Sequence, residues 1–215
     1  MSSTCKSSDI VTLIRGLCES LIMSQEEFCS LDAKAGDGDL GITITYGCRA
    51  VIRYIDGFGD SFPPIGKFFE SCGEHFEENT GSTFSTVAAE MFYSAGESAG
   101  SKEELTAEDA AKLFNAMADG VAKRGKVTLG DKTIYDALKP SADAFHRSVE
   151  KGHSFTDAME EARTAAETGM ESTKGMKAKI GRASWMGDKV IKEVDAGSVV
   201  WVRVMEYITE HSRQV

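Results

Sequence analysis

The sequence contains no apolar run long enough to cross a membrane. Its longest apolar stretches, such as residues 198–205, fall well short of the roughly 20 residues that a transmembrane helix needs. The N-terminal residues, MSSTCKSSD, are polar and lack the apolar core of a secretory signal peptide. We therefore expect a cytoplasmic protein that does not bind membranes.

Basic residues are in deficit. The chain has 24 lysines and arginines against 34 aspartates and glutamates, which gives a formal net charge of −10. The resulting negative field repels phosphate backbones and anionic membrane surfaces unless a local basic patch or a metal ion reverses it. We therefore expect no nucleic-acid partner.

The sequence also lacks the patterns of a disulfide framework or a zinc site. Its five cysteines are odd in number and form no C-x-x-C pair, which indicates reduced and mostly buried thiols. The four histidines have no close cysteine or carboxylate spacing, so a histidine-based zinc site is not expected.

Runs of β-branched residues are scarce, and alanine, glutamate, lysine and methionine are prominent, so the composition favours helices. Apolar residues recur at steps of three and four, as at Ile10 and Ile14. This spacing predicts a helix over residues 8–23, capped by Ser7 or Ser8. Similar stripes follow along the chain, and no repeat or long linker interrupts them. We expect about eight helices in one all-α domain spanning residues 1–215.

Several turns carry helix-capping residues. Residues 24–27, SQEE, have the form of a capping box and predict a short second helix. Thr106 with Asp109 predicts another cap, and Asp131 in GDKT is expected to cap the helix that follows it.

The C-terminal segment has two interpretations. Its β-branched residues from Val199 to Val204 would suit a strand. We favour a helix, because Val199, Val202 and Met205 are spaced at three and no partner strand is evident elsewhere.

An acidic, glycine-rich stretch, LDAKAGDGDLG at residues 31–41, is the first candidate site. It places Asp32, Asp37 and Asp39 within eight positions. If they converge, two such charges at about 4 Å repel by roughly 1 kcal/mol in water and about 4 kcal/mol at an effective dielectric near 20, so a proton or a cation is needed. Hard oxygen ligands select Mg²⁺ or Ca²⁺. An EF-hand is excluded because position 12, counted from Asp37, is Cys48 instead of glutamate. The alternative is a solvated turn.

Two further loops suit a phosphate. Ser82 and Thr83, in TGST, supply hydroxyl groups before an apolar helix whose N-terminal amides can bind an anion. Residues 173–184 form a basic loop that includes Lys179 and Arg182, and an arginine fork suits phosphate oxygens. A basic loop opposite an acidic metal loop is the charge arrangement that a metal–nucleotide complex needs. The alternatives are an ordinary helix cap and a solvated basic loop.

Three motifs together resemble the nucleotide-binding L subunit of dihydroxyacetone kinases. They are LDAKAGDGDLG, GDKTIYDAL followed by KPSADAF, and TKGMKAKIGRASWMGDKVIKEVDAG. The resemblance implies a barrel of eight antiparallel helices with the nucleotide at one end. It also implies that Asp32, Asp37 and Asp39 coordinate two Mg²⁺ ions, which bridge to the phosphates of ADP or ATP.

The same resemblance assigns the remaining site residues position by position. With the three aspartates, Arg182 belongs to the implied catalytic set. The implied phosphate contacts are Leu40, Gly41, Ile42, Thr43, Ser82 and Thr83, and the implied lining of the nucleotide site is Gly125, Ile134, Arg182, Asp195, Ala196 and Gly197.

The resemblance also implies partners. In the family a histidine on a separate K subunit or domain holds the sugar covalently, so this chain brings the nucleotide half and passes a phosphoryl group to a triose or similar ketose. One version of the family uses ATP; the other keeps ADP bound and has it rephosphorylated by a phosphotransferase-system protein. With no fused sugar-binding domain in its 215 residues, the chain fits a separate subunit in either version. We also expect a homodimer.

Three positions depart from the family pattern. Leu40 stands where G-D-G-D-H-G has histidine, Phe84 where a small glycine is usual, and Ala196 where D-P-G has proline. Loss of the histidine removes a polar group beside the phosphates, and a phenylalanine at a helix start is expected to narrow the anion pocket. These departures leave open a regulatory or interaction module that binds nucleotide or metal without catalysis. A helical scaffold without a ligand is disfavoured, because it gives no reason for acidic, hydroxyl-bearing and basic loops in one helical domain.

Overall fold

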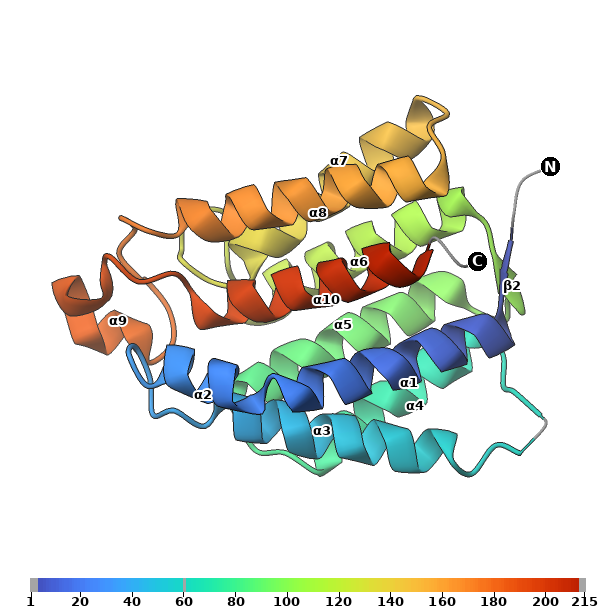
Figure 1. Ribbon diagram of the computed structural model, residues 1–215, viewed down its shortest axis with the longest axis horizontal. Helices are drawn as coiled ribbons and strands as arrows, with labels where there is room; N and C mark the ends of the chain where they lie inside the picture. Colours follow the sequence, from blue (N-terminus) through green and yellow to red (C-terminus); the bar gives the residue numbers. More distant parts are fainter. Residues whose placement is uncertain (1–3, 60, 213–215) are drawn as a thin grey trace.

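The computed structural model describes residues 4–59 and 61–212, and almost all of this chain is helical (Figure 1). Residues 1–3 of the polar N-terminal stretch lie outside the described residues. The helices are α1 Ser7–Met23, α2 Gln25–Asp32, α3 Leu40–Ile55, α4 Ile65–Glu78, α5 Thr83–Ala99, α6 Ala107–Gly125, α7 Tyr135–Glu150, α8 Phe155–Ser172, α9 Ala183–Met186 and α10 Ala196–Ser212, with a 3-10 helix η1 at Gly187–Val190 and strands β1 Cys5–Lys6 and β2 Glu104–Leu105.

In the described part of the chain, eight long helices form a closed antiparallel ring. From α3 to α8 each helix packs on the next, α10 packs on α8 and α1, and α1 packs on α3 (Figure 1). The short helices α2 and α9 lie at one end of the ring, on the left in Figure 1. The predicted barrel of about eight antiparallel helices is therefore confirmed.

The apolar stripes face the inside of this ring. Ile10 and Ile14 of α1 are buried, as their spacing predicted. The C-terminal segment is the helix α10, with Val199 and Met205 buried, and the strand interpretation is wrong. Buried Trp201 of α10 donates a hydrogen bond to the Ser141 hydroxyl of α7 at 2.8 Å, which fixes how these two helices pack.

Some predicted caps differ in the structure. Helix α1 begins at Ser7, so neither Ser7 nor Ser8 caps it. Its N-cap is Lys6, which is held extended because β1 pairs with β2 in a small antiparallel sheet that the sequence did not reveal. Ser24 precedes α2 but makes no side-chain capping bond. The Thr106 and Asp109 cap is confirmed, since each side chain accepts the other residue's N–H at 3.2 Å.

Two expectations drawn from composition concern thiols and membranes. The cysteines are free thiols, and Cys18, Cys48 and Cys72 are buried, as predicted. Among the described residues, no helix combines the length and the apolar character that crossing a bilayer requires.

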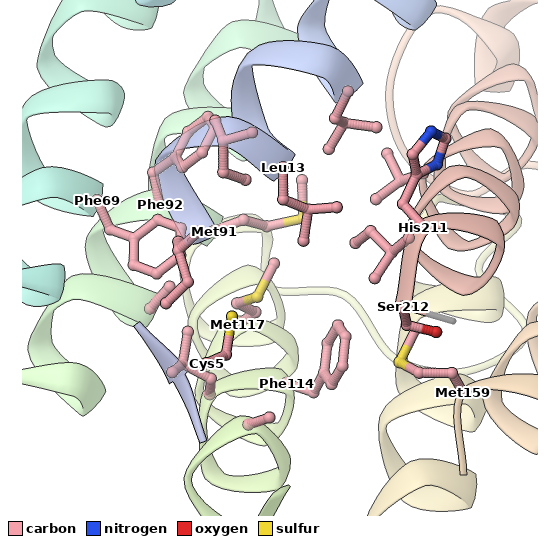
Figure 2. A pocket seen from close by; sticks show the side chains of 18 of the residues that line it. Cys5, Leu13, Phe69, Met91, Phe92, Phe114, Met117, Met159, His211 and Ser212 are labelled. Atoms are coloured by element: carbon pink, nitrogen blue, oxygen red, sulfur yellow. The ribbon is translucent and has the colours of Figure 1, made fainter. Parts of the chain in front are cut away.

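An apolar cavity of about 410 Å³ lies inside the ring, toward the end that holds β1 and the end of α10. Figure 2 shows Met91, Met117 and Phe114 around it, with His211 across the opening. The lining comes from both groups of packed side chains in the barrel, one built mainly from α1 to α5 and the other from α6 to α8 and α10. The opposite end of the ring is therefore the one left for the polar loops.

Close packing of α7 on α8 is expected to depend on Gly169. A Cβ atom added there would lie 2.1 Å from the carbonyl oxygen of Asp136, a backbone atom that cannot rotate away. We expect Gly169→Ala to lower the free energy of unfolding by about 2 kcal/mol, the usual scale of overpacking. Urea denaturation followed by circular dichroism measures this. Gly81→Ala is the control, because an added Cβ there meets nothing within 4 Å. Equal stability of the two variants would contradict the tight contact.

Candidate functional site

The antiparallel order of the ring brings the candidate loops to one end. Because successive helices alternate in direction, α3, α5, α7 and α10 all begin at the end where α2 and α9 lie (Figure 1). The start of each of these four described helices carries residues that the resemblance assigned to the nucleotide. Their N-terminal amides form a positive pole, which favours an anion despite the acidic net charge.

The acidic loop between α2 and α3 folds around the carboxylate of Asp32. One oxygen of this group accepts the N–H of Gly38 at 2.8 Å and that of Asp39 at 3.1 Å. Gly38 has φ +78°, a conformation that favours glycine. At Gly36 a Cβ would meet the Asp32 carboxylate at 2.4 Å, so the two glycines allow the loop to close.

Closure of the loop gathers the three aspartates. Asp32, Asp37 and Asp39 each offer a carboxylate oxygen, and these atoms lie within 4.8 Å of one another. Three carboxylates are a hard, anionic donor set of the kind that holds Mg²⁺ or Ca²⁺. The donor chemistry of the predicted metal ligands therefore fits such a cation.

Arg182 lies against this cluster. Its guanidinium pairs with Asp37 and lies 3.5 Å from a carboxylate oxygen of Asp39. Loss of hydration and the neighbouring charge of Asp37 raise the pKa of Asp39, and Arg182 opposes that rise. One guanidinium against three carboxylates leaves a formal excess of negative charge, which a divalent cation would offset.

The first turn of α3 places its side chains differently from what the resemblance suggests. Leu40 is buried in the core, Thr43 is buried, and only Ile42 is substantially exposed. A Cβ at Gly41 would lie 2.1 Å from the carbonyl oxygen of Gln25, so α3 begins in close contact with α2. Any ligand at this turn would therefore meet backbone amides and Ile42, while Leu40 faces the core instead of the loop.

The start of α5 is an ordinary capped helix. The hydroxyl of Ser82 accepts the N–H of Ser85 at 3.2 Å, while Thr83 is exposed. Phe84 packs against both parts of the core and lines the cavity. The expectation that Phe84 narrows an anion pocket is therefore wrong, because its side chain turns into the barrel.

At the start of α10, Asp195 joins three segments. Its carboxylate accepts the N–H of Ser198 at 2.6 Å and caps the helix, and its own N–H donates to the Thr173 hydroxyl at 2.9 Å. A Cβ at Gly197 would lie 3.3 Å from the Cβ of Ile134, so these two predicted lining residues are neighbours. Ala196 begins α10 and packs on the core, and Gly125 ends α6 at the same end of the barrel.

Two charged residues of the GDKT turn were missed as site components. Asp131 is not the cap of α7: that helix has Ile134 as its N-cap, and Asp136 accepts the N–H groups of Gly130 and Thr133. Asp131 is buried and pairs with Lys179 at 2.7 Å, while buried Lys132 donates to the backbone carbonyls of Val190, the last residue of η1, and Glu193. The GDKT motif marked this turn in the sequence, but nothing in it assigned a role to either charge.

Asp195 is expected to destabilise the fold when it is charged. Burial raises the pKa of its carboxyl group to about 6, so the folded chain holds this proton above the pH at which the unfolded chain releases it. Stability should therefore fall as pH rises from about 4 to about 6. Asp195→Asn keeps an acceptor for Ser198 and should raise the free energy of unfolding at pH 7 by up to roughly 3 kcal/mol, with no gain below about pH 4.

Urea denaturation at a series of pH values measures this difference. Asp119→Asn, at an exposed position of α6, is the control and should change little at any pH. A gain for Asp195→Asn that is the same at pH 4 and pH 7 would show that the charge is not its cause.

Comparisons with known proteins agree with this architecture. Residues 34–210 match the DAK2 domain family. The chain is 29% identical over 192 residues to the ADP-binding subunit DhaL of the PEP-dependent dihydroxyacetone kinase of Escherichia coli (strain K12), covering 89% of this chain and 90% of that protein. It is 26% identical over 204 residues to triokinase/FMN cyclase of Mus musculus, covering 95% of this chain and 35% of that protein.

Solved structures share the fold. The dihydroxyacetone kinase of C. freundii in its native form superimposes with a TM-score of 0.73 at 20% identity, over 94% of this chain and 34% of that one. The same kinase in complex with AMP-PNP and Mg²⁺ gives a TM-score of 0.69, over 93% and 33%. With the family match extending over most of its length, this chain belongs to the DAK2 domain family.

Proposed function

We propose that this chain is the nucleotide-binding subunit of a dihydroxyacetone-type kinase, which holds Mg-ATP or Mg-ADP at the α2/α9 end of the barrel. The observation that carries the proposal is the convergence of Asp32, Asp37 and Asp39 with Arg182, at the end where four described helices begin. The relative from Escherichia coli is named an ADP-binding subunit, and the superimposed kinase of C. freundii was solved with AMP-PNP and Mg²⁺. Both names support a nucleotide at this site.

The acidic cluster is proposed to hold two Mg²⁺ ions. Magnesium is commonly bound by one or two carboxylates, with phosphates and water filling the other positions, so three aspartates can serve two ions that share a nucleotide. Such ions supply charge neutralisation on the phosphates during phosphoryl transfer. Asp32 also accepts hydrogen bonds from two backbone N–H groups, which orient its carboxylate toward the others.

The remaining site residues are proposed to bind and orient the nucleotide. The first-turn N–H groups of Leu40, Gly41 and Ile42 in α3 and of Thr83 in α5 would donate hydrogen bonds to phosphate oxygens. The N–H groups of Thr43 and Ser82 already donate to the Asp39 carbonyl and the Ser85 hydroxyl, so these two residues would line the same turns. Arg182 would change partners from Asp37 to a phosphate when a cation takes over the carboxylates. Ile134 and Gly197, with Gly125, Asp195 and Ala196, would line the nucleoside side of the site.

The phosphoryl acceptor is proposed to lie on a partner. The terminal phosphoryl group would leave the nucleotide as its bond to the next phosphate breaks, and a hydroxyl oxygen of a triose or related ketose on a K subunit would form the new bond. A phosphotransferase-system protein is the proposed phosphoryl donor if ADP stays bound, in keeping with the PEP-dependent kinase named among the relatives. We propose a cytoplasmic homodimer for this subunit.

A second function is a module that binds Mg-nucleotide without transferring the phosphoryl group. The observation that favours it is Leu40, whose side chain is buried in the core and brings no polar group to the start of α3. Binding and turnover must therefore be measured separately.

Asp37 is expected to dominate magnesium-dependent nucleotide binding. Asp37→Asn keeps the size of the side chain but removes one charge from the cluster, so it should weaken Mg-ADP binding by at least roughly tenfold. Because the side chain is exposed, the free energy of unfolding should change by less than about 0.5 kcal/mol. Isothermal titration calorimetry and urea denaturation measure the two quantities.

Asp56→Asn is the matched control, since Asp56 ends the same helix α3 at the opposite end of the barrel and pairs with Arg15. It should leave Mg-ADP binding unchanged. Equal affinity of Asp37→Asn and the unaltered chain would mean that the acidic loop is only a turn.

Catalysis is tested with a partner. The chain is mixed with a sugar-binding K subunit, dihydroxyacetone and either Mg-ATP or a phosphotransferase donor system, and formation of the sugar phosphate is followed in a coupled assay. We expect turnover that depends on both subunits and on Mg²⁺. Tight Mg-ADP binding without turnover on any small ketose would instead establish the second function.

A further inference from the structure

The segment that carries Arg182 has little structure of its own. Residues 173–195, which we call the arginine segment, connect α8 to α10 and contain only the four-residue helix α9 and the short η1. We call the residues before Arg182 the first arm and those after it the second arm. The two arms meet where the N–H of Gly175 donates to the carbonyl of Ile191 at 2.7 Å. Arg182 lies between the arms and is half exposed. Its place beside the acidic loop must therefore be set by contacts that hold the arms.

The first arm is held by Asp131. The carboxylate of Asp131 pairs with the ammonium group of Lys179 at 2.7 Å, and its backbone carbonyl accepts the N–H of Lys179 at 3.1 Å. The other carboxylate oxygen accepts the N–H and the hydroxyl of Thr128 at 2.7 and 3.1 Å. Asp131 thus joins its own turn to a position three residues before Arg182.

The second arm is held by Lys132. This side chain is buried, with 3% of the residue exposed, and its ammonium group donates to the carbonyl oxygens of Val190 at 2.8 Å and Glu193 at 2.6 Å. The carboxylate of Glu193 pairs in turn with Lys34 of the acidic loop at 2.9 Å. The second arm is therefore tied both to the GDKT turn and to the loop that carries the aspartates.

The turn itself is strained to make these contacts. Lys132 has φ +61°, in the left-handed region that side-chain-bearing residues seldom adopt. Such a conformation costs on the order of 1 kcal/mol and persists only where surrounding contacts require it. A buried lysine also gives up its hydration, and replacing buried charges by apolar groups is often neutral or stabilising. Stability alone therefore gives no reason for the buried charge of Lys132.

We propose that Asp131 and Lys132 are positioning residues that hold the two arms of the arginine segment, so that the guanidinium of Arg182 lies beside Asp37 and Asp39. The inference rests on the proposed function, because the site that Arg182 serves is the proposed Mg-nucleotide site. Neither residue touches the acidic cluster; each acts through the segment that it holds.

Asp131→Asn separates positioning from simple electrostatics. Removing a negative charge near an anion site should, through the field alone, leave nucleotide binding unchanged or strengthen it. If Asp131 instead positions Arg182, the variant should change the affinity in the opposite direction. Mg-ADP binding should weaken by roughly tenfold, because Arg182 then has to be ordered on binding. It should also speed amide hydrogen exchange in residues 176–185 by roughly tenfold, measured without nucleotide or Mg²⁺.

The matched control is Asp143→Asn. Asp143 of α7 also pairs with a lysine, Lys139, so this variant removes the same charge and breaks the same type of ion pair elsewhere. It should change neither exchange in the arginine segment nor Mg-ADP binding. Unchanged exchange in Asp131→Asn, or Mg-ADP binding as tight as in the unaltered chain, would overturn the proposal.

A double-mutant cycle tests whether Lys179 acts through Asp131. Lys179 is exposed, so Lys179→Met should fold normally and reproduce the exchange and binding changes of Asp131→Asn. The double variant should then be no worse than either single variant. Fully additive losses would mean that Lys179 contacts the nucleotide directly, which would overturn the role of Asp131 as its holder.

Lys132→Met tests the second arm, with Lys139→Met as its control. Exchange should increase in residues 187–193 and Mg-ADP binding should weaken, whereas exchange like that of the unaltered chain would overturn the role of Lys132. If Lys132→Met does not fold, Glu193→Gln tests the same arm through the pair with Lys34, and increased exchange is again expected. If the unaltered chain binds no Mg-ADP at all, the proposed function fails, and the exchange measurements alone decide whether the two residues hold the segment.

Discussion

Mutual repulsion of Asp32, Asp37 and Asp39 is the constraint on which this end of the molecule depends. Their carboxylate oxygens lie within 4.8 Å of one another, where like charges repel by several kcal/mol at an effective dielectric near 20. The structure offsets the repulsion with backbone N–H groups on Asp32 and one guanidinium on Asp37 and Asp39. That compensation is incomplete, so a divalent cation between the carboxylates would be stabilised by the remaining negative charge.

The barrel makes an anion acceptable beside these carboxylates. Because the long helices alternate in direction, two loops lie at the same end of the barrel only when an even number of long helices separates them. This holds for the starts of α3, α5, α7 and α10, which therefore lie at one end. Their N-terminal dipoles add to Arg182 and Lys179 around an acidic cluster. A cation and a polyanion can then bind together although the whole chain has a net charge of −10, which would disfavour the polyanion alone.

Helix periodicity and the family motifs were sufficient to predict the barrel, and the acidic motif predicted three aspartates that the structure brings together. Periodicity identifies buried faces such as Ile10 and Ile14 because core packing and helix period coincide there. It carries no information on where a side chain at a helix start turns, and both Leu40 and Phe84 face the core. It also could not reveal Lys132, because its contacts are to carbonyl groups about 60 residues further along the chain and need a left-handed backbone.

Charge burial distinguishes the site end from the rest of the barrel. Away from it the interior is apolar, around a cavity lined by methionine, phenylalanine and aliphatic side chains. At the site end Asp131 and Lys132 are buried and Asp195 is partly buried, and loss of hydration raises the pKa of Asp195 while it lowers that of Lys132. Each of these shifts means that the charged form is disfavoured in the folded chain. Charged forms that the fold disfavours add little stability, so the concentration of Lys132 and Asp195 at one end supports the proposal that the loops there are held in place for a ligand.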